Sequence, residues 1–368
     1  MNDKMKNIVL TVVMTAFLIV LTLFSWLKPQ DNYSDSERRE LAKFPKLSIE
    51  TILSGKFMTD FESYTLDQFP LRDNFRTLKS ISAFYGLHQL DNNDIYLADG
   101  YASKLEYPLN ITMIDNAADK FKWLYDTYMA DKHMTLYYSV VPDKNYFLAE
   151  ENGYLSFDYD ELTGRLREQI EYMEYIDITD LLSIEDYYRT DTHWKQENII
   201  DVAERLANKI GTDISGEYTE NTLDQPFYGV YYGQSALPLS PDTIKYLTND
   251  TLDACVVTSY SNGTPVTQPM YNMDKAYGKD AYEMFLSGTE AILTIENPNA
   301  NTDKELIVFR DSFGSSLVPL LAEGYSKITV VDIRYVQSSY LGNVIEFENQ
   351  DVLFLYSTLV LNDSVILN

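Results

Sequence analysis

The pattern of apolar and polar positions along this chain predicts strands separated by helices. Short apolar runs that are typical of buried strands occur at residues 135–141, 254–260, 291–295, 306–309, 328–333 and 352–356. Apolar residues that recur at helical spacing predict helices at residues 115–131, 159–175 and 195–210. Because strands and helices alternate, we expect an α/β fold in which helices cover both faces of a mostly parallel sheet.

The first apolar stretch has a different character. Residues 8–27 carry no charge, and at 1.5 Å per residue a helix of this length spans about 30 Å, the thickness of a bilayer core. Lys4 and Lys6 precede it, which favours an N-terminus inside the cell. No small-residue cleavage site follows, so a signal anchor is favoured over a cleaved signal peptide. We expect a single-pass cell-membrane protein whose remaining domain is extracellular.

Composition divides the rest of the chain. Residues 1–30 form the predicted anchor, and residues 31–90 a polar stalk with a helical region that packs on the domain. Residues 91–368 form the main domain. Within it, residues 213–301 are rich in Tyr, Thr, Asn, Gly and Pro, and we expect them to be an insertion or cap beside the sheet.

Charge and cysteine content exclude several classes of function. Among 368 residues, the net charge of −27 argues against binding to nucleic acid or to an anionic lipid surface. Cys255 is the only cysteine, so neither an internal disulfide nor a multi-cysteine metal site can form. The 30 tyrosines suit either a glycan-binding surface or a large core.

A serine lies where one predicted strand turns into a helix. Residues 306–309 are apolar, Arg310, Asp311 and Ser312 follow, and apolar residues at helical spacing resume at Leu317. Open α/β sheets place their sites at the carboxyl ends of strands, and a helix N-terminus favours developing negative charge. The alternative is that Asp311 or Ser312 only caps the helix.

Of the three histidines, only His193 has an acidic residue at a useful spacing. In an extended stretch Asp191 and His193 point to one side, so Asp191 can hold Nδ1–H and leave Nε2 to take a proton from a serine. Two alternatives remain, in which Asp191 caps the next helix or joins His193 in a metal site. The metal site would need further ligands that no motif supplies, so we expect neither a metal nor another cofactor. Trp194 either shields the site from water or belongs to the core.

Several further motifs carry a resemblance to a known family. These are Glu37–Pro45 (ERRELAKFP), Phe61–Tyr64 (FESY), Asp67–Asp73 (DQFPLRD), Val141–Lys144 (VPDK), Asp191–Trp194 (DTHW), Arg310–Phe313 (RDSF) and Asp332–Tyr335 (DIRY). With them the chain resembles the DHHW family of Gram-positive surface proteins, which are similar to the SGNH-like alginate O-acetylation proteins of the AlgX and AlgJ type. The resemblance extends from the anchor to the last strands.

The resemblance implies an SGNH-hydrolase-like three-layer α/β/α sandwich with its motifs in permuted order. It implies Ser312 as nucleophile, His193 as base and Asp191 as the orienting acid. Between Asp191 and His193 the family usually has histidine or another residue, and here it is Thr192; Arg310 stands where SGNH enzymes often have glycine.

The remaining site residues have less defined roles. Gly288 could offer a backbone N–H, and Asn297 a side-chain amide, to an oxyanion. Arg310 and Arg334 are either charge clamps near the site or structurally paired arginines.

The expected function is acyl transfer by a serine-dependent enzyme. The acyl group would pass to a hydroxyl of a cell-surface or secreted polysaccharide, which makes the protein an O-acetyltransferase. By analogy with the alginate systems, a membrane-embedded acyltransferase would supply the acyl group. The alternatives are an acetyl esterase with the same site and a non-catalytic surface protein that binds glycan through residues 213–301.

Overall fold

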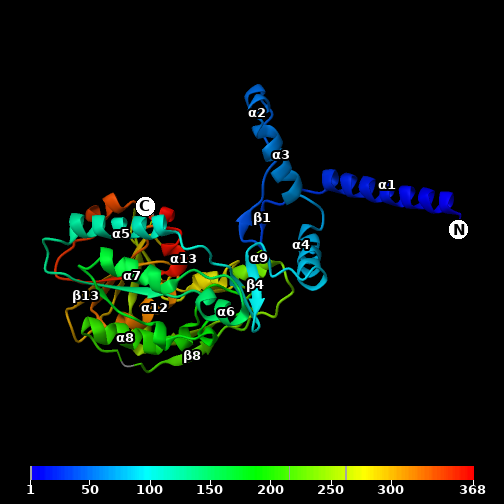
Figure 1. Cartoon of the computed structure of the whole chain (residues 1–368). Helices are drawn as coiled ribbons and strands as arrows, with labels where there is room; N and C mark the ends of the chain where they lie inside the picture. Colours follow the sequence, from blue (N-terminus) through cyan, green and yellow to red (C-terminus); the bar gives the residue numbers. More distant parts are fainter. Residues whose placement is uncertain (1, 215, 262) are drawn as a thin grey trace. The chain divides into compact units, whose positions relative to one another are not determined.

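The computed structural model describes residues 2–214, 216–261 and 263–368, and these divide into two units. The first unit contains residues 2–93 and 232–238, and the second contains residues 94–231 and 239–368. Helix α9 (Val230–Ser235) contributes residues to both. Figure 1 shows both units with the chain coloured from N- to C-terminus.

The first unit begins with the predicted apolar helix. Helix α1 (Asp3–Leu27) is confirmed, and its segment Asp3–Ser25 is long and apolar enough to cross a membrane. None of the apolar window is buried against the rest of the protein. Its length, composition and position at the N-terminus are those of a membrane anchor or a signal sequence.

An ion-pair network stabilises the remainder of the first unit. Its other elements are β1 (Tyr33–Ser34), β2 (Arg39–Glu40), α2 (Ile49–Leu53), α3 (Lys56–Asp67), α4 (Arg72–Ile81), a π-helix (Ser82–Gly86) and β3 (Asp91–Asn92). Asp67 accepts two hydrogen bonds from Arg39, at 2.8 and 2.5 Å, while Glu37 pairs with Arg72 and Arg76. The two motifs at Glu37–Pro45 and Asp67–Asp73 therefore hold each other through charge-assisted hydrogen bonds.

An eight-stranded sheet forms the centre of the second unit, in the order β11-β10-β12-β14-β13-β15-β6-β7. Its strands are β6 (Thr135–Val141), β7 (Glu174–Tyr175), β10 (Val256–Ser259), β11 (Val266–Gln268), β12 (Ile292–Glu296), β13 (Glu305–Arg310), β14 (Lys327–Val331) and β15 (Asp351–Ser357). The run from β14 to β7 is parallel, and β12, β10 and β11 extend it in antiparallel pairs. The sheet is therefore mainly parallel, as predicted.

Helices cover both faces of this sheet (Figure 1). Helices α5 (Ile111–Tyr128) and α7 (Tyr159–Gln169) pack on one face, and α8 (Ile200–Ile210) and α12 (Gly314–Leu321) pack on the other. The strands are buried on both sides because they lie between these two layers, which explains their continuous apolar runs. The predicted three-layer α/β/α sandwich is confirmed.

Shorter elements connect the layers. They are β4 (Ile95–Ala98), β5 (Tyr101–Lys104), α6 (Lys144–Asn152), β8 (Thr219–Thr222), β9 (Lys245–Thr248), α10 (Asp250–Ala254), α11 (Met273–Ala276) and α13 (Thr358–Leu361). Strands β4 and β5 pair as a hairpin, and β8 pairs with β9 in a small separate sheet.

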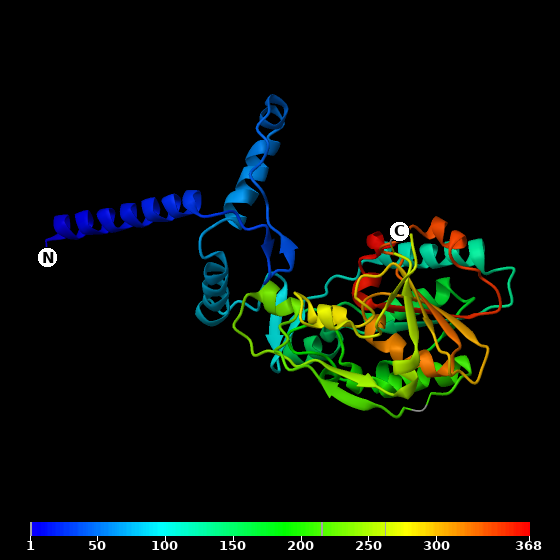
Figure 2. The same cartoon turned by 180° about the vertical axis from the view of Figure 1, so that it is seen from behind.

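Residues 213–301 do not lie wholly beside the sheet. Their strands β10, β11 and β12 continue the central sheet at the edge beyond β14, as Figure 2 shows from behind. The small β8–β9 sheet lies outside it. Strands β10, β11 and β12 are therefore part of the central sheet, because β12 pairs with β14 and the other two extend the same edge.

Candidate active site

Ser312 lies in the turn that joins β13 to α12. The preceding residue, Asp311, is fully buried, and its two carboxylate oxygens accept the backbone N–H of Phe313 at 3.0 Å and of Ser357 at 2.7 Å. Asp311 thereby ties the turn to the carboxyl end of β15. Helix α12 begins without a side-chain cap, so neither Asp311 nor Ser312 serves as its N-cap.

The turn is tight because glycine follows it. A Cβ on Gly314 would lie 2.7 Å from Cβ of Arg310, so the helix can begin directly beneath the strand only with glycine there. The backbone N–H groups of the turn are occupied with one exception. Asp311, Phe313, Gly314 and Ser315 each donate to an acceptor, whereas the Ser312 N–H has no acceptor among the described residues.

A second loop, before α8, carries the aspartate and histidine. Asp191 is 1% exposed, and its Oδ1 accepts both the backbone N–H of His193 at 3.1 Å and ring Nδ1 at 2.6 Å. Its Oδ2 accepts the backbone N–H of Val230 at 2.8 Å. Three hydrogen bonds thus fix the carboxylate, and the bond to Nδ1 favours the imidazole tautomer with a free Nε2.

The two loops meet at a hydrogen bond. Nε2 of His193 lies 2.8 Å from Oγ of Ser312, although the two residues are 119 positions apart in the chain. The structure therefore brings Ser312, His193 and Asp191 together, in the order hydroxyl, imidazole, carboxylate. This is the geometry in which a histidine can take a proton from a serine while a carboxylate stabilises the imidazolium.

Aromatic rings enclose the imidazole. Tyr282 stacks on His193 with ring centroids 3.8 Å apart and an interplanar angle of 8°, and Phe313 lies 5.0 Å away at a tilt. The Tyr282 hydroxyl lies 2.8 Å from Ser316 Oγ on α12. The ring of His193 is therefore held in its plane as well as at both nitrogens. No sequence motif indicates Tyr282, because it lies in a short 3₁₀ turn that is far from both loops along the chain.

Trp194 does not face the site. It is fully buried in the core, and its Nε1–H donates to the Phe313 carbonyl at 3.1 Å and to Ser316 Oγ at 3.0 Å. Of the two interpretations of Trp194, burial supports the one in which it belongs to the core, because no part of the side chain reaches the surface. The indole instead connects the two loops, because Trp194 directly follows His193 and its N–H bonds to Phe313, which directly follows Ser312.

Two arginines share one buried carboxylate beside the turn. Arg334 donates to both oxygens of Asp332, at 2.9 and 2.7 Å, and Arg310 Nη1 approaches the same carboxylate at 3.4 Å. Arg310 is 1% exposed and also donates to the Gly288 carbonyl at 3.2 Å. Arg310 is thus a structural arginine, because a buried and paired guanidinium cannot clamp substrate. Arg334 stays partly exposed, and its contact with substrate stays a prediction.

The two predicted oxyanion donors are not available. Gly288 has a left-handed φ of 76°, and its N–H already donates to the Phe285 carbonyl at 3.1 Å. Asn297 directly follows β12, which runs antiparallel to β14, so it lies at the end of the sheet opposite to Ser312. Its amide donates to the Ala322 carbonyl at 3.0 Å. The sequence could not show where Asn297 lies, because it does not indicate whether β12 runs parallel or antiparallel to its neighbour.

A buried lysine and a partly buried aspartate support the loop that carries Asp191. Lys144, 2% exposed, donates from Nζ to the carbonyls of Tyr188 and Arg189 at 2.9 and 3.2 Å. Burial lowers the pKa of Lys144 to about 7, and the Asp191 carboxylate partly opposes this effect. Asp242 accepts the backbone N–H groups of Arg189 and Thr190 at 2.9 and 2.8 Å.

Next to Lys144, another carboxylate ties strand ends together. Asp143 accepts Oγ1 of Thr358 at 2.6 Å, the hydroxyl of Tyr159 at 3.0 Å and the N–H of Asn145 at 2.7 Å. Burial raises the pKa of Asp143 to about 6, although the hydrogen bond from Thr358 opposes this. Within the described residues, no three His, Cys, Asp or Glu side chains gather as a metal site.

The fold, with its serine at the carboxyl edge of a mainly parallel sheet, is an SGNH-like α/β/α sandwich. The family model described as DHHW protein matches residues 178–331, which confirms the predicted resemblance to the DHHW family. These residues include the Asp191–Trp194 motif and Ser312. No curated protein matches the sequence.

Solved structures of two proteins, a DHHW family protein and PatB1, share the fold. A DHHW family protein from Eubacterium siraeum DSM 15702 is 21% identical, with a TM-score of 0.57 over 74% of this chain and 93% of its own. Bacillus cereus PatB1, also solved with a sulfonyl adduct, is 18% identical, with a TM-score of 0.58 over 73% of this chain and 96% of its own. The O-acetyltransferase domain of Pseudomonas putida AlgJ is 14% identical, with a TM-score of 0.43 over 73% and 92%.

Proposed function

We propose that this protein is a membrane-anchored, serine-dependent O-acyltransferase that acetylates a hydroxyl of an extracellular polysaccharide. The observation that carries the proposal is the 2.8 Å contact between Ser312 Oγ and His193 Nε2, with Asp191 2.6 Å from Nδ1. A buried, charge-oriented imidazole against a hydroxyl is the arrangement that activates a serine for attack on a carbonyl carbon.

The first half of the reaction forms an acyl-enzyme. His193 Nε2 takes the proton of Ser312 as Oγ attacks the carbonyl carbon of the acyl donor. The negative charge that develops on the carbonyl oxygen is stabilised by the Ser312 N–H, which lies at the start of α12 and has no acceptor within the described part of the chain. His193 then gives its proton to the departing oxygen of the donor, and the acyl group remains as an ester on Ser312.

The second half returns the enzyme to its starting state. His193 takes a proton from a sugar hydroxyl, whose oxygen attacks the acyl-serine ester. The intermediate collapses with transfer of the proton to Ser312 Oγ, and the product is an O-acetylated sugar. Water in place of the sugar gives hydrolysis, which is the esterase alternative with the same residues.

The proposed location follows from helix α1. Its length and apolar composition suit a single membrane crossing, and Lys4 and Lys6 favour a cytoplasmic N-terminus, which would place the catalytic unit outside the cell. An acyl donor made inside the cell would then have to cross the membrane. A membrane-embedded acyltransferase that passes the acyl group outward is the partner this arrangement requires.

The second candidate is a non-catalytic glycan-binding protein that keeps the fold. The hydrogen-bonded order of Ser312, His193 and Asp191 favours the enzyme, because glycan binding alone needs no buried aspartate behind the histidine. The sulfonyl adduct on PatB1 points the same way, since sulfonyl reagents modify activated hydroxyls.

The test uses the full chain in detergent micelles. We expect 4-nitrophenyl acetate to be hydrolysed and phenylmethylsulfonyl fluoride to add one sulfonyl group, located at Ser312 by peptide mass spectrometry. Ser312→Ala should abolish both. Ser315→Ala is the matched control, because this buried hydroxyl is three residues further along and does not contact His193. Equal hydrolysis by wild type and Ser312→Ala would refute the proposal.

Transfer is separated from hydrolysis by a second measurement. Acetyl groups labelled with ¹⁴C are supplied on 4-nitrophenyl acetate together with oligosaccharides, and label is counted in sugar and in free acetate. Ser312-dependent label in the sugar supports the transferase. Ser312-dependent label in acetate alone would assign the esterase.

A further inference from the structure

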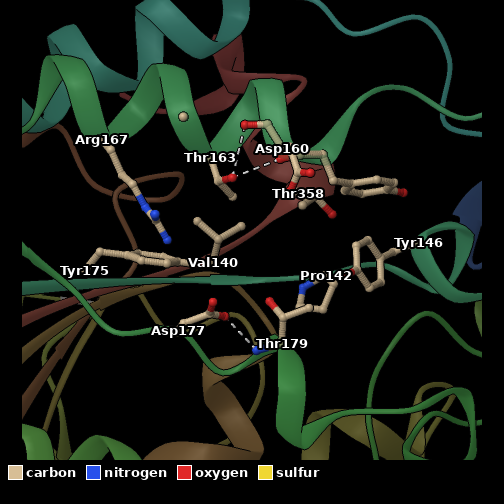
Figure 3. A pocket seen from close by; sticks show the side chains of 12 residues that line it. Val140, Pro142, Tyr146, Asp160, Thr163, Arg167, Tyr175, Asp177, Thr179 and Thr358 are labelled. Carbon is tan, nitrogen blue, oxygen red and sulfur yellow. Dashed lines mark hydrogen bonds between the residues drawn. The ribbon is translucent and has the colours of Figure 1, made fainter.

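A cavity of about 440 Å³ lies beside the site, under helix α7 (Figure 3). Helix α7 lines one side with Asp160, Thr163 and Arg167, and the strand ends and following loop line the other with Tyr175 and Asp177. Its size falls within the range of sites that hold small ligands. None of these residues takes part in the proposed acyl-transfer chemistry.

The cavity and Ser312 share the carboxyl edge of the sheet. Thr358, which lines the cavity, directly follows Ser357, and Asp311 accepts the Ser357 N–H at 2.7 Å. Strands β13, β15, β6 and β7 are consecutive neighbours, so the far wall at Tyr175 lies about 14 Å from β13, three strand spacings away. The cavity is on the α7 side of the sheet and α12 is on the other. A ligand that reaches both must therefore pass over the ends of the strands.

The lining combines aromatic rings with hydrogen-bonding groups of both kinds. Tyr146 is 40% exposed, and the guanidinium of Arg167 lies 4.2 Å from the centre of the Tyr175 ring. Arg167 forms no ion pair among the described residues. Its guanidinium interacts with Tyr138 and Tyr175, and because it carries five N–H donors, others of them can donate to a ligand. Asp160 and Asp177 are exposed and can only accept.

This combination selects for one class of ligand. A sugar hydroxyl both donates and accepts, so a pyranose can bond to Arg167 and to the aspartates while its apolar face lies on a tyrosine ring. A carboxylated sugar can pair with Arg167 but is repelled by Asp160 and Asp177, which leave one net negative charge in the lining. The lining therefore favours an uncharged sugar.

We propose that this cavity binds an uncharged sugar unit of the acceptor glycan while another unit of the same chain reaches Ser312. The inference rests on the proposed function for the identity of the glycan as acceptor. The binding itself does not depend on acyl chemistry. Because the far wall of the cavity at Tyr175 lies about 14 Å from β13 along the sheet edge, a glycan that fills the cavity and also reaches Ser312 must have more than one sugar unit.

Binding is tested with the full-length Ser312→Ala protein in detergent micelles, so that catalysis plays no part. The probes for isothermal titration calorimetry are maltohexaose, cellohexaose, N-acetylchitohexaose and hexagalacturonate. We expect at least one uncharged hexamer to bind, and to bind at least tenfold more tightly than hexagalacturonate. Arg167→Ala and Tyr146→Ala should each weaken that binding at least fivefold.

The matched control is Arg165→Ala, on the same helix. Arg165 forms hydrogen bonds to Asp115 at 2.5 and 2.7 Å and does not line the cavity, so its loss should leave the dissociation constant unchanged. Thermal melting checks that each variant folds. The proposal is overturned if no uncharged hexamer binds, if hexagalacturonate binds best, or if both cavity variants bind as wild type does.

These results are independent of the Ser312 tests. Binding that depends on Arg167, together with hydrolysis that does not depend on Ser312, would keep the sugar site and reject the proposed function. Ser312-dependent hydrolysis without hexamer binding would do the reverse.

Discussion

Replacing Asp191 with asparagine tests the role of this carboxylate in orienting His193. Oδ1 of the carboxylate accepts two hydrogen bonds from His193, and Oδ2 accepts one from the N–H of Val230. Asparagine has one carbonyl oxygen and one NH₂ group, so it cannot accept on both sides. Each of its two orientations therefore sets the NH₂ group against a backbone N–H.

The two orientations disable the site in different ways. If the NH₂ group faces His193, Nδ1 must accept, the ring proton moves to Nε2, and Nε2 can no longer take the proton of Ser312. If the NH₂ group faces Val230, the tautomer is kept, but one buried N–H loses its acceptor at a cost of about 1–3 kcal/mol. In both cases the negative charge that stabilises the imidazolium is gone.

We expect kcat/KM for 4-nitrophenyl acetate to fall about 10²- to 10⁴-fold, the range for loss of general-base catalysis. This corresponds to about 3–5 kcal/mol in the barrier. Asp242→Asn is the control, because it removes a charge that supports the same loop without contacting the imidazole. If Asp191→Asn kept more than a tenth of wild-type kcat/KM with an unchanged melting temperature, the reasoning would be refuted.

Three further predictions concern the packing around the site. Gly229→Ala should reduce activity at least a hundredfold, because a Cβ there would overlap Cβ and Cα of Asp191. Gly86→Ala should not reduce activity, because a Cβ there meets no atom within 4 Å. Equal activity of the two variants would contradict the prediction. Trp194→Phe should lower the free energy of unfolding by about 2–3 kcal/mol, measured by denaturant titration. The substitution removes the N–H donor to Phe313 and Ser316 and part of the core volume. A loss below about 0.5 kcal/mol would show that the hydrogen bonds of the indole contribute little. Between pH 7 and 10 the free energy of unfolding of the wild type should rise by up to about 1.4 kcal/mol per pH unit because of Lys144. The unfolded chain keeps the Lys144 proton up to the ordinary pKa of 10.5, whereas the folded chain releases it at about 7. Lys144→Met should lack this rise, and the same dependence of melting on pH in both proteins would exclude the prediction.

Much of the fold could be predicted from the sequence. The apolar runs at residues 135–141 and 352–356 became β6 and β15, and the helical spacing at residues 195–210 became α8 after a short 3₁₀ turn. These predictions were correct because a buried parallel strand must be apolar throughout and a covering helix must be apolar on one side. The region 213–301 was harder to interpret, because short antiparallel strands with polar neighbours resemble loops.

The site divides in the same way. Asp191 and His193 could be paired from their spacing of two, and Ser312 could be singled out because a strand changes to a helix at that point. Their approach to within 2.6 and 2.8 Å required the fold, since 119 residues separate the histidine from the serine. The sequence did not indicate Tyr282 or Val230, because each comes next to Asp191 or His193 only when the chain folds.

The sequence by itself determined the apolar N-terminal helix, the alternation of strands and helices, and the choice of Asp191, His193 and Ser312 as candidate site residues. Each of these depends only on residue types that lie close together in the chain. Only the tertiary structure decided that Arg310 and Trp194 are buried, that Asn297 lies at the opposite end of the sheet, and that the N–H of Ser312 has no acceptor among the described residues. Burial, strand direction and hydrogen-bond partners depend on which distant segments pair, and pairing is a property of the whole sheet rather than of any one stretch.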